Sequence, residues 1–189
     1  ANYSAPSISA FSPSSFETMV PTTVVISGNN FGAITNLFRL RVWYFLNETR
    51  IYSTTSCLVV TNHTHIECNT SKLILGYGRA QFKWQAEVQY VYSEVTNTST
   101  RYKKPEIQSL QYHLDLDTRG GELVILRGLN FGPAVKHGVV PLYTTYMSAS
   151  SGLVFQASLC NVTDNTEMRC FSAEGVGKGF SWKVEIESL

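Results

Sequence analysis

Cysteine and histidine are the residue types of this 189-residue chain with the most potential for chemistry. The four cysteines form two local pairs, Cys57/Cys68 and Cys160/Cys170. His63 and His65 lie inside the first pair, and side chains two residues apart on a strand face the same side, so a zinc site is one alternative there. The second pair has no histidine between its cysteines, and its spacing fails the usual zinc patterns. We therefore expect no metal.

Two carboxylates, Asp115 and Asp117, are spaced to share one face of a strand or loop. Calcium takes about six to eight oxygen ligands, and one short pair supplies too few, so we expect a solvated loop. The chain contains no nucleophile elbow, zinc-protease motif, P-loop or dinucleotide fingerprint. The sequence therefore predicts a protein that is not an enzyme and binds no cofactor.

Asparagine offers a different chemistry, because six asparagines lie in N-x-[ST] sequons for N-glycosylation. They are Asn2, Asn47, Asn62, Asn69, Asn97 and Asn161. Sequons arise by chance in a chain rich in Ser, Thr and Asn, at about one or two for this length. Six of them, together with paired cysteines, predict an N-glycosylated extracellular protein in oxidising surroundings.

Charge and hydropathy exclude two classes of partner. The chain has 15 basic and 14 acidic residues, a net charge of +1, which gives no reason to expect nucleic acid or an anionic membrane as a partner. No apolar run approaches the length of a membrane span, so we expect no membrane insertion. Charge is uneven, with nine basic and five acidic residues in 1–104 but six and nine in 105–189.

An internal repeat organises the chain. Three segments recur at offsets of 98 to 100 residues: 6–11 with 105–110, 24–32 with 124–132, and 76–88 with 175–186. The two cysteine pairs align as well, with Cys68 and Cys170 offset by 102 residues. We therefore predict two homologous domains, residues 1–104 and 105–189. About a hundred residues is the size of a small β-sandwich.

Short strands must carry these residues, because no helical period of useful length is present. In the first repeat we expect strands at 7–11, 22–27, 39–45, 56–60, 65–69, 80–92 and 95–102. The predicted fold class is all-β, with two tandem immunoglobulin-like sandwiches. In the repeated Gly-x-Asn-Phe-Gly motif, Gly and Asn permit positive φ and a sharp turn. Phe31, Phe131, Trp84 and Trp182 are expected to pack in the cores.

The order of motifs resembles the IPT/TIG family: Pro-x-Ile, Gly-x-Asn-Phe-Gly, a cysteine pair, then Gly-x-Gly before an aromatic strand. The resemblance covers nearly the whole chain in two copies. It implies immunoglobulin-like sandwiches of cell-surface receptors, adhesion and matrix proteins or transcription factors. The last branch fits poorly, since it needs basic loops and a reducing compartment. The resemblance also implies that each cysteine pair closes a hairpin as a disulfide.

The two repeats end differently. Trp84 is followed by 20 residues before Pro105, including a last strand, whereas seven residues follow Trp182. Tyr3–Pro6 matches Tyr102–Pro105, the end of that last strand. We therefore expect the second domain to lack its last strand and to expose an assembly edge. The residues expected there are Ala1, Asn2, Tyr3, Ser4, Trp182, Val184, Ile186 and Leu189.

An open edge of this kind invites a strand from a neighbour. The predicted function is an extracellular, glycosylated structural protein, a protomer or repeat segment of a head-to-tail surface fibre in which the N-terminal segment of the next copy completes the sandwich. Three alternatives stay open. The chain is a piece of a longer tandem array, another protein supplies the strand, or the chain belongs to an adhesion or receptor ectodomain that binds a protein ligand.

Overall fold

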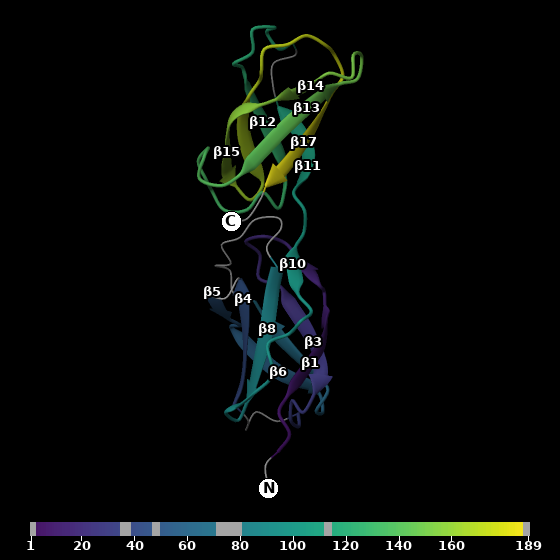
Figure 1. Ribbon diagram of the computed structural model, residues 1–189, viewed down its shortest axis with the longest axis vertical. Coiled ribbons are helices and arrows are strands. Elements are labelled where there is room, and N and C mark those ends of the chain that lie inside the picture. Colours follow the sequence, from purple (N-terminus) through teal and green to yellow (C-terminus); the bar gives the residue numbers. More distant parts are fainter. Residues whose placement is uncertain (1–2, 35–38, 47–49, 71–80, 112–114, 187–189) are drawn as a thin grey trace. The chain divides into compact units, whose positions relative to one another are not determined.

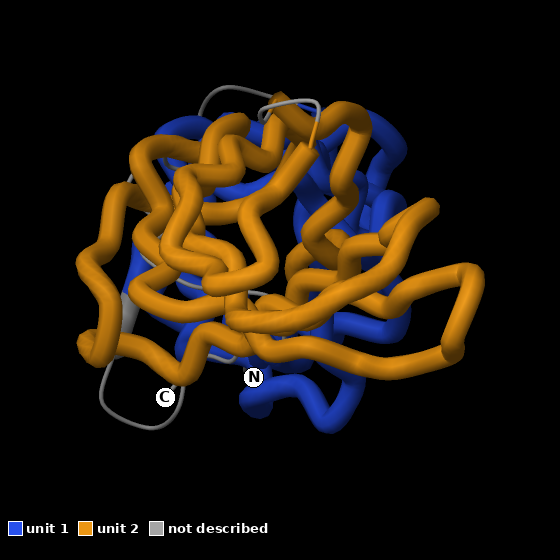
Figure 2. The backbone as a smooth tube through the Cα atoms, turned by 90° about the horizontal axis from the view of Figure 1, so that it is seen from above, with its two compact units in different colours: residues 1–74, 81–101 blue, residues 75–80, 102–189 orange. Residues whose placement is uncertain are grey.

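The computed structural model describes residues 3–34, 39–46, 50–70, 81–111 and 115–186. The described residues form strands and no helix, which confirms the all-β prediction. No segment among them is therefore a helix able to cross a membrane. The chain divides into two compact units, Ala1–Ile74 with Gln81–Arg101 and Leu75–Ala80 with Tyr102–Leu189 (Figure 2). A domain boundary at residue 104 stays a prediction.

The first unit contains two sheets (Figure 1). The first sheet has the order β1 (Ser7–Ser12), β3 (Thr23–Asn29), β7 (His65–Asn69), β6 (Ser56–Thr61). The second has the order β2 (Ser15–Phe16), β10 (Thr100–Tyr102), β8 (Gln81–Val88), β4 (Leu40–Leu46), β5 (Arg50–Ser53), and β9 (Val91–Tyr92) also pairs with β8. Alternate side chains of β3 and β4 point into the core, as the period of two requires.

The second unit also contains two sheets, both antiparallel, but its second sheet is smaller. The first sheet has the order β11 (Glu106–Gln111), β12 (Leu123–Leu129), β16 (Glu167–Phe171), β15 (Ser158–Asp164). The second has the order β14 (Val154–Gln156), β13 (Leu142–Ser148), β17 (Phe180–Ile186). In the described residues nothing in this unit corresponds to β2 or β10, so β17 is an edge strand where β8 is a central one.

The predicted strand at 80–92 is wrong in one respect, because it is a hairpin. β8 ends at Val88, Gln89 and Tyr90 turn the chain with φ of 50° and 68°, and β9 pairs back on Glu87 and Val88. Of the predicted strand at 95–102, only Thr100–Tyr102 is a regular strand, β10. β2 and β5 were not predicted.

The repeated glycine motif forms a tight junction between two strands. Gly28 pairs with Ile8 and Gly128 with Ile107, one pair before the end of each strand pairing and beside a register shift. A Cβ on Gly28 would lie 1.8 Å from the Ser7 carbonyl oxygen, and one on Gly128 1.8 Å from that of Glu106. These glycines are therefore required for close backbone approach, and the positive φ expected of the motif falls elsewhere.

The positive φ angles of the motif lie at its asparagine and at its last glycine. Asn30 and Asn130 have φ of 63° and 62°, and each donates its side-chain amide to a carbonyl of the preceding linker. This turn directs Phe31 and Phe131 inward, where both are fully buried. Their expected role as core anchors therefore agrees with the structure.

Candidate assembly edge and cavity in the second unit

The same four-ring aromatic cluster lies in both units. In the second unit, the cluster consists of Tyr146, Phe155, Phe180 and Trp182. Tyr146 stacks on Trp182 at 4.4 Å between ring centroids and on Phe155 at 5.3 Å, and meets Phe180 edge-on at 5.2 Å. The first unit repeats these contacts with Tyr44, Tyr52, Phe82 and Trp84. The strand registers agree too, since Tyr44 pairs with Trp84 and Tyr146 with Trp182.

In the first unit this cluster is covered by Phe16 and by the segment that leads into β10. The Phe16 ring lies 6.1 Å from Phe82 and 6.4 Å from Trp84, centroid to centroid. The indole N–H of Trp84 donates to Thr100 Oγ1 at 2.9 Å. Trp84 is consequently 0% exposed.

The edge of β8 is closed by hydrogen bonds from the same segment. Trp84 N–H donates to Thr96 Oγ1 at 3.0 Å, and its C=O accepts from Thr96 N–H at 2.9 Å. Ala86 N–H donates to Ser93 Oγ at 3.0 Å, and its C=O accepts from Ser93 N–H at 2.8 Å. Every backbone group that these two β8 residues direct to this edge is therefore satisfied within the unit.

In the second unit the matching edge of β17 carries no strand among the described residues. Ala157 N–H donates to the C=O of Thr144, so even-numbered β13 residues direct their backbone groups toward β14 and odd-numbered ones toward β17. Thr145 pairs with Lys183, so Trp182 and Val184 direct their N–H and C=O groups to the open side. Trp182 and Val184 are half-buried, whereas their counterparts Trp84 and Ala86 are buried.

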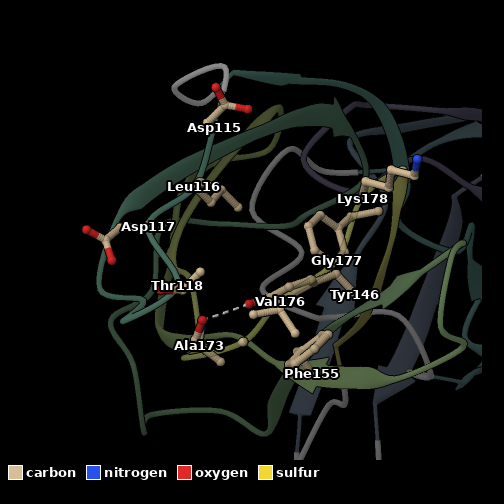
Figure 3. A pocket seen from close by; sticks show the side chains of 13 residues that line it. Asp115, Leu116, Asp117, Thr118, Tyr146, Phe155, Ala173, Val176, Gly177 and Lys178 are labelled. Atoms are coloured by element: carbon tan, nitrogen blue, oxygen red, sulfur yellow. Dashed lines mark hydrogen bonds between the residues drawn. The ribbon is translucent and has the colours of Figure 1, made fainter.

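A cavity of about 340 Å³ lies in the second unit, where Phe180 begins β17. Three rings of the cluster, Tyr146, Phe155 and Phe180, line it together with Leu116 and the Gly175–Gly179 loop (Figure 3). A Cβ on Gly175 would lie 2.3 Å from the Phe155 ring, so the loop can cross the cluster only with glycine there. In the sequence, Leu-Asp-Thr at 116–118 aligns with Phe-Glu-Thr at 16–18, so Leu116 is the counterpart of Phe16 in the repeat.

The polar groups that line the cavity include the Tyr146 hydroxyl and two carboxylates. The Tyr146 hydroxyl donates to the Ala173 C=O at 3.2 Å and accepts from the Ala173 N–H at 2.9 Å, which fixes the ring. Burial raises the pKa of the Tyr146 phenol, so it stays neutral. Asp115 and Asp117 lie at the rim with their carboxylates turned from the rings (Figure 3).

Asp115 and Asp117 belong to no cluster of metal-ligating side chains in the described residues. Asp117 accepts two hydrogen bonds from the Arg119 guanidinium, at 2.7 and 3.1 Å, which lower the pKa of that carboxyl. No group of three metal-ligating side chains occurs in the parts of the chain that the structure describes. His63 lies in the β6–β7 turn with φ of 65°, and His65 begins β7, where its Nδ1 lies 2.9 Å from Thr64 Oγ1.

The cysteines join neighbouring strands of one sheet. Cys57 on β6 is bonded to Cys68 on β7, and Cys160 on β15 to Cys170 on β16. Both therefore close a local hairpin. Loops of this length correspond to about 2–3 kcal/mol of stabilisation in the chain-entropy model.

The sequon asparagines have different surroundings. Asn97 is exposed in a turn, and Asn62 and Asn69 are exposed but bonded through their side chains to Ile34 N–H and to Thr23 and Ser56, respectively. Asn161 is half-buried, with Oδ1 accepting from His137 N–H. Asn2 and Asn47 lie outside the described residues.

The residues predicted for an assembly edge are not all together. Trp182, Val184 and Ile186 lie on β17, with Ile186 buried in the core. Tyr3 and Ser4 belong to the first unit, where Tyr3 is 97% exposed. Ala1, Asn2 and Leu189 lie outside the described residues. The sequence did not reveal the cavity, although the Gly175–Gly179 loop was a visible signal.

The fold and this site define an all-β, disulfide-bonded protein of immunoglobulin-like sandwiches with an open sheet edge in the described second unit. The chain is similar to two solved structures of the plexin A4 full extracellular region. One is 16% identical over 93% of this chain, with a TM-score of 0.36, and the other 13% identical over 97%, with a TM-score of 0.38. The chain spans 14% and 18% of their lengths. No family model and no curated protein matches.

Proposed function

We propose that the chain is an extracellular, N-glycosylated structural protein that assembles head to tail through the open edge of β17. The observation that supports this most is the contrast between β8, whose edge is closed within its unit, and β17, whose edge is open in the described residues. Trp182 and Val184 direct N–H and C=O groups to this edge that have no partner strand among the described residues, which matches the requirement for strand addition. The role is structural, and we propose no catalytic residue, cofactor or nucleic-acid partner.

Charge favours contact between unlike ends of two copies. Residues 1–104 carry nine basic and five acidic residues, and residues 105–189 carry six and nine. A donor from the first unit of one copy therefore approaches a second unit of opposite charge, although salt screens this attraction over about 8–10 Å. A head-to-tail contact is heterologous, and it produces a filament when it does not close into a ring.

We expect the purified chain to form oligomers that grow with concentration and appear as thin filaments by electron microscopy. Val184→Pro removes the N–H that faces the open edge, so it should abolish assembly while the pairing of β17 with β13 persists. Lys183→Ala is the matched control, because Lys183 directs its backbone toward β13 and its side chain to solvent. Sedimentation velocity measures the size distribution of all three chains. A wild-type chain that stays monomeric at every concentration would refute the proposal.

The alternative function, an adhesion or receptor ectodomain, predicts a different result from the same edge. In that case the wild-type chain stays monomeric, and β17 amides become protected from hydrogen exchange only when a foreign protein is added.

The extracellular assignment has its own test. Expressed through a secretory pathway, the chain should lose mass on glycosidase treatment in steps that correspond to occupied sequons. Asn97 is expected to be modified most completely, because its side chain is exposed in a turn and makes no hydrogen bond among the described residues. Intact-mass and peptide mass spectrometry measure the occupancy of each site. Finding all six asparagines unmodified would contradict the secretory route.

A further inference from the structure

We infer that the outward face of β4, β8 and β10 in the first unit binds an anionic polysaccharide, a sugar chain that carries sulfate or carboxylate groups. The three strands are neighbours in the second sheet of that unit (Figure 1). The inference does not depend on the proposed assembly, because β17 belongs to the second unit.

The outward face of these strands is basic. Their burial patterns alternate, so the odd-numbered residues of all three strands face away from the core. The cations among these residues are Arg41, Lys83 and Arg101, and all three are exposed. None of them forms an ion pair with another described residue. Their charges are therefore available to an anion.

Acidic side chains hardly oppose this charge. Glu87 is the only acidic residue in the described strands of the sheet. It is fully buried, and its Oε1 lies 3.0 Å from Arg39 Nε, so its charge is neutralised below the surface. Glu17 and Glu94 lie just beyond the ends of β2 and β9. The net charge of +1 for the whole chain thus conceals a sheet whose exposed charges are positive.

Aromatic rings lie among the cations. Trp43 of β4 stacks on Tyr92 of β9 at 6.0 Å between ring centroids, and the Arg39 guanidinium lies 4.3 Å from the centre of the Tyr90 ring. Tyr92 is 52% exposed and Tyr90 66%. The C–H face of a sugar ring packs on such rings while its hydroxyl groups stay hydrated. Sulfate and carboxylate groups bind guanidinium and ammonium groups. The face therefore offers both contacts that a charged sugar chain needs.

The turn between β8 and β9 fixes the two tyrosines in place. It consists of Gln89 and Tyr90, with φ of 50° and 68°, a left-handed conformation that residues other than Gly, Asn and Asp rarely adopt. The Gln89 N–H donates to the Arg39 C=O at 2.9 Å, and the Arg39 side chain packs on Tyr90. The rings are thus ordered before a ligand binds, which lowers the entropy cost of binding.

The cations follow a line along β8. Arg101 pairs with Gln81 at one end of the strand and Arg41 with Glu87 near the other, with Lys83 between them. Six residues of strand separate the two ends, or about 20 Å. A free sulfate ion reaches one of these cations, whereas an extended polyanion contacts all three. The two disulfides favour an oxidising, extracellular setting, which makes a charged polysaccharide a better candidate than nucleic acid.

The second unit shows that the fold does not require this face. By the strand registers, the residues that correspond to Arg41, Trp43 and Lys83 are Tyr143, Thr145 and Ser181. Lys183 is the only cation in the described strands of that sheet, and it forms an ion pair with Glu185 at 2.5 Å. The combination of free cations and aromatic rings is therefore specific to the first unit.

The test titrates a heparin octasaccharide, as the probe, into the full chain by calorimetry at low salt and at about 0.15 M salt. Arg41→Gln, Lys83→Gln and Arg101→Gln should each weaken binding about threefold to tenfold, and the triple variant should flatten the salt dependence, because each cation releases counter-ions on binding. Tyr92→Ala should weaken binding by a similar factor and leave the salt dependence unchanged, since it removes no charge. Lys183→Gln is the matched control that should change nothing.

Several results would overturn the inference. They are an absence of binding at low salt, equal binding by the triple variant, and equal binding of a neutral maltooctaose. Tighter binding of an oligothymidylate of the same charge would make nucleic acid the ligand, and loss of self-association in the triple variant would make a second copy the occupant.

The same titration separates this inference from the proposed function. The Val184→Pro chain should bind the octasaccharide as tightly as the wild-type chain, so a failure of assembly leaves the inference standing. The three cations are exposed, and their variants do not threaten folding. Circular dichroism verifies the Tyr92→Ala chain.

Discussion

A Gly128→Ala chain is expected to lose about 3 kcal/mol or more of the stability of its second unit, enough to unfold a marginal sandwich in part. The added Cβ would lie 1.8 Å from the Glu106 carbonyl oxygen and 2.8 Å from Phe131 Cζ. The first atom is backbone and cannot rotate away. Relief therefore requires β11 to separate from β12, or Phe131 to leave the core.

Hydrogen exchange read separately in β12 and β3 measures this effect, because each unit then reports its own opening free energy. Gly121→Ala is the control, since Gly121 has φ of 80° and open space around the Cβ position. It should cost only the left-handed strain, about 1 kcal/mol. Gly28→Ala should reproduce the large loss in the first unit alone. Equal protection of β12 in the Gly121→Ala and Gly128→Ala chains would contradict a steric role.

The repeated motif shows how far sequence reasoning reaches. Glycine, asparagine and phenylalanine at fixed spacing predicted a sharp turn and a buried ring, and both are present. The motif alone did not show which residue has positive φ and which one allows the close approach of two backbones. Positive φ falls on Asn30 and Gly32, while Gly28 provides a close approach that involves Ser7, about twenty residues away. A contact between distant strands leaves no trace in local periodicity.

Short strands are also difficult to predict from the sequence. β2 has two residues and β5 four, too few for an alternating pattern to be distinguished from loop. The hairpin of β8 and β9 was missed because Gln89 and Tyr90 are not typical turn residues, and tertiary contacts hold them at positive φ. The cavity could not be predicted either, because it is lined by segments that are distant in sequence, such as Asp115–Thr118 and Gly175–Phe180, and only the fold brings them together.

The tryptophans of the two units should respond very differently to truncation. Trp84→Ala is expected to destabilise the first unit by about 3–5 kcal/mol, because the indole is fully buried, contacts Tyr44, Phe11 and Phe16, and leaves Thr100 Oγ1 without its donor. Trp182→Ala should cost the isolated chain only about 1–2 kcal/mol. Trp182 stacks on Tyr146 but is only partly buried.

This asymmetry also tests whether β17 is an acceptor. When a donor strand covers the edge, Trp182 becomes as buried as Trp84, and truncation then removes a packed ring as well as a hydrogen-bond donor. The cost of Trp182→Ala should consequently rise toward that of Trp84→Ala in assembled material, while the cost of Trp84→Ala stays the same at every concentration. Hydrogen exchange in β4 and β13, measured for dilute and assembled chains, gives both quantities. A Trp182→Ala cost independent of concentration means that nothing covers the β17 edge, because a donor strand cannot reach Val184 without enclosing its neighbour.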